Sequence, residues 1–84
     1  MVERLLMIED DARLAQMVSQ YLGQSGYQVT HAADAHSGLE RLKSRGSEPL
    51  PDLVILDLML PDMDGLEVCK RIRAMPGALA RLPV

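Results

Sequence analysis

Carboxylates directly follow two short apolar runs of this sequence, and these acids are the part of the chain best suited to chemistry. Glu9 and Asp10 follow Leu5–Ile8, and Asp57 follows Leu53–Leu56. Two carboxylates about 4 Å apart repel each other by about 4 kcal/mol at an effective dielectric constant of about 20. A cluster of such groups therefore needs a proton or a cation. Oxygen ligands with no His or Cys nearby favour a hard ion, so we expect Mg²⁺ at these acids.

Two predicted strands must position the acids. Leu5–Ile8 ends abruptly in acidic residues, which indicates a buried strand followed by a turn. Leu53–Leu56 is a continuous apolar run, typical of a strand that is covered on both faces of a parallel sheet. The carboxyl ends of parallel strands meet at one edge of a sheet, where open α/β folds place their ligand sites. We therefore expect Glu9, Asp10 and Asp57 to lie within a few ångströms of one another.

The segment after the first acids has the period of a helix. Asp10 or Asp11 is placed to cap this helix, and the glycines at 23 and 26 end it. Its predicted apolar face consists of Leu14, Val18, Tyr21 and Leu22. A strand over Tyr27–His31 follows.

Two further helices are predicted. One follows the cap Asp34, carries Leu39 and Leu42 on one face and stops near Gly46. The other follows Gly65, and its apolar stripe consists of Leu66, Cys69 and Ile72. Leu82–Val84 resembles the start of another strand. The order βαβαβα predicts an α/β layered domain with right-handed crossovers.

Composition limits the classes of function. The 84 residues make one small domain, and the net charge of −3 is unsuited to binding DNA, RNA or an anionic membrane. No apolar run approaches the roughly 20 residues of a membrane span, and the amino terminus lacks the pattern of a signal peptide. The single Cys69 cannot form an internal disulfide. These features predict a cytoplasmic chain.

An acid that follows a strand is often only a helix cap. Here two such sequences occur together, namely Leu5-Leu-Met-Ile-Glu9-Asp10-Asp11 and Pro51-Asp-Leu-Val-Ile-Leu-Asp57-Leu-Met-Leu-Pro61-Asp-Met-Asp64-Gly65. In both motifs the chain resembles the receiver domain of two-component response regulators. The resemblance covers nearly all of residues 1–84 and is closest to the amino-terminal receivers of winged-helix transcriptional regulators. It implies a flavodoxin-like parallel-sheet fold, incomplete here, with about three of the five βα units.

The resemblance also implies roles for individual residues. Asp57 would be the phosphoacceptor, and Glu9 and Asp10 would be the acidic pair that holds Mg²⁺ together with Asp57. Met59 would lend its backbone carbonyl to the metal. The phosphodonor would be a phosphohistidine on a sensor histidine kinase. Such a domain is not an enzyme in the usual sense, although it assists its own phosphorylation and dephosphorylation.

The match stops where a receiver's fourth strand would begin, so the switch hydroxyl and the phosphate-pairing lysine of the family have no counterpart. We therefore expect residues 1–84 to be the amino-terminal portion of a longer regulator, with any DNA contact made by a domain beyond residue 84. Self-association, as a homodimer or otherwise, is expected from the uncovered strand edge.

Two alternatives remain beside a working receiver. One is a receiver-like interaction or dimerisation module that is never phosphorylated. The other is a phosphatase of the haloacid-dehalogenase type, which needs a second acid two residues after its nucleophile, where this chain has Met59. The glycines do not form a nucleotide-binding fingerprint.

Overall fold

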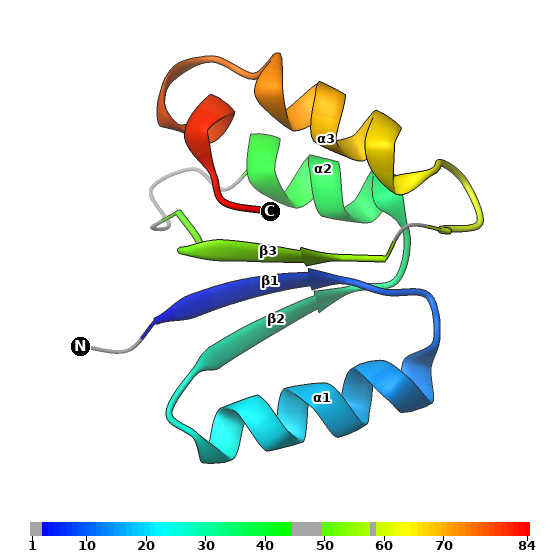
Figure 1. The fold of residues 1–84 in the computed structure, drawn as a ribbon, viewed down its shortest axis with the longest axis vertical. Helices are drawn as coiled ribbons and strands as arrows, with labels where there is room; N and C mark the ends of the chain where they lie inside the picture. Colours follow the sequence, from blue (N-terminus) through cyan, green and yellow to red (C-terminus); the bar gives the residue numbers. More distant parts are fainter. Residues whose placement is uncertain (1–2, 45–49, 58) are drawn as a thin grey trace.

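The computed structural model describes residues 3–44, 50–57 and 59–84. Its centre is a parallel sheet of β1 (Arg4–Ile8), β2 (Gln28–Ala32) and β3 (Leu53–Leu56), in the order β2-β1-β3. The helices are α1 (Ala12–Gln24), α2 (Ala35–Lys43) and α3 (Gly65–Arg73), and a 3₁₀ helix, η1, spans Gly77–Arg81. Figure 1 shows α1 on one face of the sheet and α2 and α3 on the other. The predicted α/β class and element order are confirmed.

Each of the three α-helices begins at an aspartate. The side chains of Asp11, Asp34 and Asp64 accept hydrogen bonds from backbone N–H groups three residues later, at 3.0, 2.7 and 2.8 Å. These bonds satisfy N–H groups that have no partner within the helix. The cap of α1 is Asp11, and Asp10 therefore remains available for another role. The predicted end of the second helix near Gly46 lies outside the described residues.

The register of the sheet brings the three strands to the same level at their carboxyl ends. Ile8 pairs with Ala32 on one side and with Leu56 on the other. The ladder continues by one bond on each side, because the N–H of Glu9 donates to the Ala32 carbonyl (3.0 Å) and the N–H of Asp57 donates to the Ile8 carbonyl (3.1 Å). Glu9 and Asp57 therefore leave the sheet side by side.

The main core lies between the sheet and the layer of α2 and α3. Its most deeply buried side chains are Ile8, Val54, Val68 and Ile72. Helix α2 approaches β1 closely at Gly38, where a Cβ atom would lie 2.5 Å from Cδ1 of Ile8. The core thus packs directly beneath the strand ends that carry the acids. Among the described residues, no helix combines the length and hydrophobicity that a membrane crossing requires.

The predicted apolar face of α1 is only partly buried. Ala15 is the buried residue of the helix, whereas Leu14 is 44% and Tyr21 is 70% exposed. Val18 and Leu22 are half-buried. In the described part of the chain no other helix lies beside α1 on its face of the sheet (Figure 1), so the outer side of the stripe faces solvent. The helical spacing of apolar residues identifies the helix, but it does not show how much of the helix surface other elements cover.

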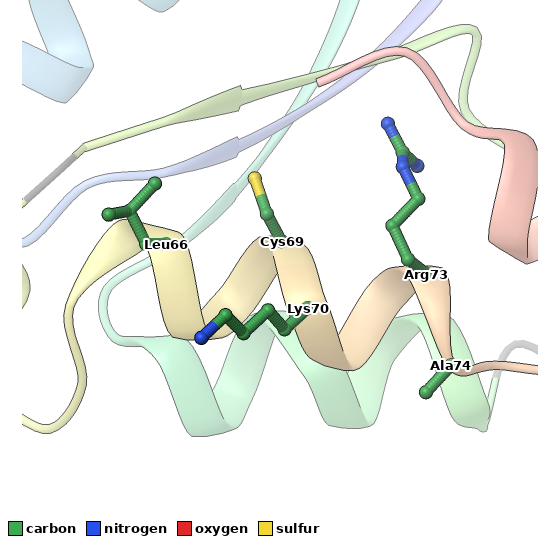
Figure 2. A pocket seen from close by; sticks show the side chains of 5 residues that line it. All are labelled: Leu66, Cys69, Lys70, Arg73 and Ala74. Atoms are coloured by element: carbon green, nitrogen blue, oxygen red, sulfur yellow. The ribbon is translucent and has the colours of Figure 1, made fainter.

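The predicted stripe of α3 is only partly right, because Ile72 is buried as expected but Leu66 and Cys69 are not. The buried residues are Gly65, Val68 and Ile72, because this side of the helix packs against α2 and belongs to the core that α2 shares with the sheet. Leu66 is 69% exposed and Cys69 is half-buried. Figure 2 shows these two side chains with those of Lys70, Arg73 and Ala74 around a shallow pocket on the flank of α3.

The carboxyl-terminal segment runs along the edge of β3. The N–H of Val54 donates to the carbonyl of Pro83 at 2.9 Å, and Leu82 is buried. Nη1 of Arg73 donates to the carbonyls of Ala80 (3.1 Å) and Leu82 (2.7 Å), which fixes the segment against α3. The segment is extended as the sequence suggests, although its pairing does not amount to a strand. Leu53 remains 37% exposed, so β3 is not covered on both faces along its whole length.

Candidate functional site

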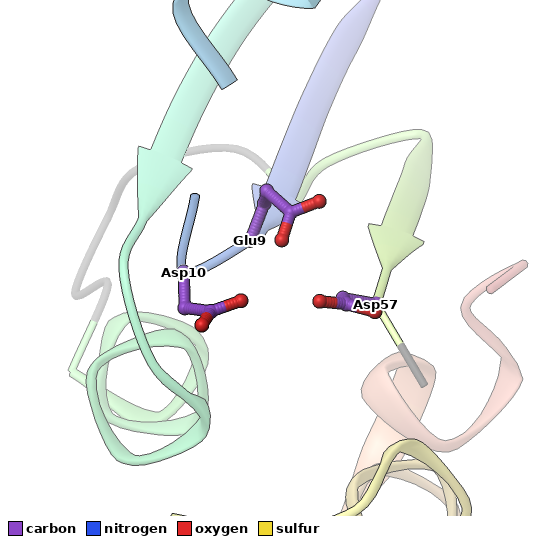
Figure 3. Close-up of side chains that lie close together, drawn as sticks. All are labelled: Glu9, Asp10 and Asp57. Carbon is purple, nitrogen blue, oxygen red and sulfur yellow. The ribbon is translucent and has the colours of Figure 1, made fainter. Parts of the chain in front are cut away.

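Three carboxylates converge at the carboxyl edge of the sheet. Glu9 and Asp10 follow β1, Asp57 follows β3, and one ligand oxygen of each lies within 4.8 Å of the other two. Figure 3 shows Asp10 and Asp57 pointing toward each other with Glu9 beside them. Glu9 and Asp57 are half-buried and Asp10 is exposed. The expected cluster of Glu9, Asp10 and Asp57 is therefore present in the fold.

Backbone groups at the strand ends hold these side chains in place. The N–H of Asp11 donates to Oε2 of Glu9 at 3.4 Å, and the N–H of Met59 donates to Oδ1 of Asp57 at 3.2 Å. Nε2 of His31 lies 2.7 Å from the backbone carbonyl of Glu9. The chain on both sides of the cluster is thus fixed by neighbouring segments.

The electrostatics of the cluster favour a proton or a cation. Partial burial raises the pKa of Glu9 above its ordinary value of 4.5, and the hydrogen bond with Asp57 and the charge of that carboxylate raise it further. The N–H of Asp11 acts in the opposite direction by lowering the pKa. Glu9 therefore holds a proton more readily than an isolated glutamate would.

The donor set fits Mg²⁺ better than a softer metal. Carboxylate oxygens are the ligands of hard cations, and Mg²⁺ binds oxygens at about 2.0–2.1 Å, so opposite ligands are separated by about 4.2 Å. The 4.8 Å that bounds the oxygens of the cluster is close to this span. Neighbouring ligands of an octahedral ion lie closer together than opposite ones, so the three acids would draw together to ligate one ion.

Met59 lies two residues after Asp57, and its side chain takes no part in the cluster. The side chain is 83% exposed, and the backbone of Met59 forms an antiparallel bridge with Asp64 at the start of α3. Its N–H donates to Asp57. A role for the Met59 carbonyl as a metal ligand stays a prediction.

Sequence reasoning gave no role to Asp62. Its carboxylate accepts from the N–H groups of Ala35 and His36, both at 2.9 Å, and so joins the β3–α3 connection to the start of α2. These contacts join residues 26 and 27 positions apart. No local pattern indicates such a bond. The one available signal was an acid in a loop at the edge of the sheet where α2 also begins.

Comparison with known proteins places this geometry in a family. The model of the response regulator receiver domain matches residues 5–84. The transcriptional regulatory protein AfsQ1 of Streptomyces coelicolor is 45% identical over 69 residues, which are 82% of this chain and 29% of that protein. The DNA-binding response regulator MtrA of Mycobacterium tuberculosis is 40% identical over 77 residues, which are 92% of this chain and 32% of that protein. The chain thus spans about a third of the length of these relatives.

Solved structures agree with this placement. The N-terminal domain of a response regulator receiver protein from Methanoculleus marisnigri matches with a TM-score of 0.86 and 31% identity, over 100% of this chain and 64% of that one. The response regulator TrrA of Thermotoga maritima, solved in complex with Mg²⁺ and BeF, matches with a TM-score of 0.76 and 30% identity, over 86% of this chain and 59% of that one. The fold is therefore the flavodoxin-like fold of receivers, of which this chain contains only part. The chain belongs to the family of response regulator receiver domains of two-component systems.

Proposed function

We propose that Asp57 accepts a phosphoryl group from a phosphohistidine of a sensor histidine kinase, in a site where Glu9, Asp10, Asp57 and the backbone carbonyl of Met59 hold Mg²⁺. The observation that carries this proposal is the convergence of the three acids at the carboxyl edge of the sheet. The TrrA structure with Mg²⁺ and BeF supports the choice of metal by relationship.

The proposed transfer is an in-line displacement. A carboxylate oxygen of Asp57 forms a bond to phosphorus while the bond from phosphorus to the histidine nitrogen breaks, and the electron pair of that bond goes to the imidazole. When bound, Mg²⁺ neutralises the anionic oxygens of the phosphoryl group. Glu9 and Asp10 keep the cation beside the acceptor. The Met59 N–H, which donates to Oδ1 of Asp57, orients the acceptor carboxylate.

The transferred group would switch an output outside these residues. Two of the relatives, AfsQ1 and MtrA, are a transcriptional regulatory protein and a DNA-binding response regulator. The net charge of −3 makes these 84 residues unsuited to contact DNA themselves. We therefore assign the regulation of transcription to a DNA-binding domain beyond residue 84 of the complete protein.

Labelling of the complete protein by a small phosphodonor tests this function. With acetyl phosphate and Mg²⁺, the wild type should gain one phosphoryl mass, which base removes. Asp57→Asn should gain none. Glu40→Gln, at an exposed acid of α2 away from the cluster, should be labelled as the wild type is. Equal labelling of wild type and Asp57→Asn would refute the assignment.

A second candidate is an interaction module that is never phosphorylated. The exposed apolar side chains Leu14, Met17 and Tyr21 on α1 favour it, because they form a surface suited to a protein partner. This function predicts no phosphoryl gain for the wild type under the same conditions, together with a partner or a second copy bound through α1. The labelling experiment therefore separates the two candidates.

A further inference from the structure

Helix α2 is capped by two separate aspartates. Within the helix its first N–H groups have no carbonyl to bond. Asp34, the residue before the helix, accepts from the N–H of Ser37 at 2.7 Å. The two N–H groups that precede it, of Ala35 and His36, donate to the two carboxylate oxygens of Asp62. Asp62 lies on the connection between β3 and α3 and is distant in sequence from α2.

The β3–α3 connection also carries Asp57, the proposed phosphoacceptor in the acidic cluster. It begins at Asp57, whose Oδ1 accepts from the N–H of Met59, and it ends at Asp64, which caps α3. Met59 and Asp64 are bridged through their backbones. The side chain of Met59 is largely exposed and cannot anchor this segment. Its described anchors are the two acids at the helix starts, the buried side chain of Leu60 and the partly buried side chain of Met63, which packs against the core.

The two hydrogen bonds between Asp62 and the start of α2 are charge-assisted. Both oxygens of an ionised carboxylate accept from N–H groups at the positive end of a helix. The N–H groups of Ala35 and then of His36 lower the pKa of Asp62 below its ordinary value of 3.8, so the carboxylate is ionised at neutral pH. Ala35 is fully buried in the core, which makes α2 a fixed point for the loop.

We propose that Asp62 is a positioning residue for the phosphoacceptor site: by bonding the start of α2, it holds the β3–α3 connection so that Asp57 and the backbone of Met59 keep the spacing that one Mg²⁺ ion needs. The inference rests on the proposed function, because it assumes that Mg²⁺ binds at the cluster. It assigns Asp62 no contact with the metal or with the phosphoryl group.

A matched pair of variants separates positioning from stability. Asp62→Ala and Asp34→Ala both remove caps from the same end of α2, and both should lower the melting temperature. Only Asp62 connects the helix to the acceptor loop. Groups that hydrogen-bond directly to metal ligands typically contribute about 10–100-fold to metal affinity, and Asp62 acts one step further away, through the backbone of the loop. We therefore expect Asp62→Ala to weaken Mg²⁺ binding by about tenfold, whereas Asp34→Ala should bind Mg²⁺ as the wild type does.

The readout is Mg²⁺ affinity of the full-length protein by calorimetric titration, at a temperature where every variant is folded by circular dichroism. Asp62→Asn keeps one acceptor oxygen and should show a smaller loss of affinity than Asp62→Ala. If Asp62→Ala does not fold, Asp62→Asn is compared directly with Asp34→Ala and should still bind Mg²⁺ more weakly.

The outcomes distinguish this inference from the proposed function. If the wild type binds Mg²⁺ and is labelled at Asp57, but the Asp62 variants keep wild-type affinity or lose no more than Asp34→Ala does, the positioning role is refuted and the proposed function stands. If the wild type binds no Mg²⁺, both are refuted.

Discussion

Asp10 differs from the other two acids of the cluster because it is exposed, whereas Glu9 and Asp57 are half-buried. Its carboxylate adds negative charge to a site in which the pKa of Glu9 is already raised. An acid in this position stabilises the folded chain only when a cation neutralises the cluster. Without a cation, repulsion among the three carboxylates opposes folding.

We therefore predict opposite effects of Asp10→Ala with and without Mg²⁺. In metal-free buffer the free energy of unfolding should rise by about 0.5–2 kcal/mol, as it commonly does when strain at a functional site is relieved. The rise in melting temperature that Mg²⁺ gives the wild type by binding the folded state should disappear. Thermal melts with and without Mg²⁺ measure both effects. An equal response to Mg²⁺ in Asp10→Ala and wild type would contradict a shared site.

At the scale of residues, the sequence predicted the acidic side chains that directly follow a strand. Glu9, Asp10 and Asp57 were found because each follows an apolar run, and parallel strands bring such positions together. Asp62 was not found, because its partners are the N–H groups of a helix that begins 27 residues earlier in the chain. Hydrogen bonds between distant segments depend on packing, which no residue pattern expresses.

At the scale of elements, the close approach of α2 to β1 at Gly38 matters most for the site. Gly38 lies against the side chain of Ile8, which is the residue that directly precedes Glu9. An added methyl group at Gly38 would lie 2.5 Å from Cδ1 and 2.7 Å from Cγ1 of Ile8, which is fully buried. The side chain of Ile8 would have to move within a packed core. Gly23, in α1, has nothing within 4 Å of the corresponding position.

These two glycines give a matched pair of substitutions. Gly38→Ala should lower the free energy of unfolding by about 1 kcal/mol, because overpacking costs about 1–3 kcal/mol and the better helix propensity of alanine offsets part of it. Gly23→Ala should raise the free energy of unfolding by roughly 0.5–1 kcal/mol through helix propensity alone. Urea denaturation of both variants checks the signs. Stabilisation by both would show that Ile8 adapts without cost.

The elements themselves were predictable to different degrees. The cap Asp34 was identified and the cap of α1 was narrowed to Asp10 or Asp11, because a cap is a property of a few neighbouring residues. The buried sides of α1 and α3 were not, because burial depends on which other elements lie alongside. Leu66 is apolar and lies at helical spacing from Cys69 and Ile72, but its side chain is 69% exposed because no described element covers it.

At the scale of the whole molecule, apolar side chains remain exposed on the helices of both faces of the sheet. Tyr21 on α1 is 70% exposed, and Leu66 on α3 is 69% exposed. The outer edge of β3 is paired only in part, through the bond from Val54 to Pro83. Exposed apolar patches and unpaired strand edges both promote association between chains.

We predict that a polypeptide of these 84 residues alone self-associates or is partly molten. Size-exclusion chromatography with light scattering should give a mass above that of a monomer, or near-ultraviolet circular dichroism of the two tyrosines should be weak. Leu66→Glu, which places a charge on the exposed flank of α3, should shift an associated form toward monomer. A monodisperse monomer with a sharp thermal transition would show instead that the three strands and their helices form a self-sufficient core.

The position of the acyl phosphate tests the central claim most directly. After labelling with acetyl phosphate and Mg²⁺, borohydride reduces a phosphorylated aspartate to homoserine, which peptide mass spectrometry locates. The account predicts homoserine at residue 57 and nowhere else in the chain, and no reduction when Mg²⁺ is removed by a chelator. Homoserine at Asp10 or at another acid, or none at all in the presence of Mg²⁺, would contradict it.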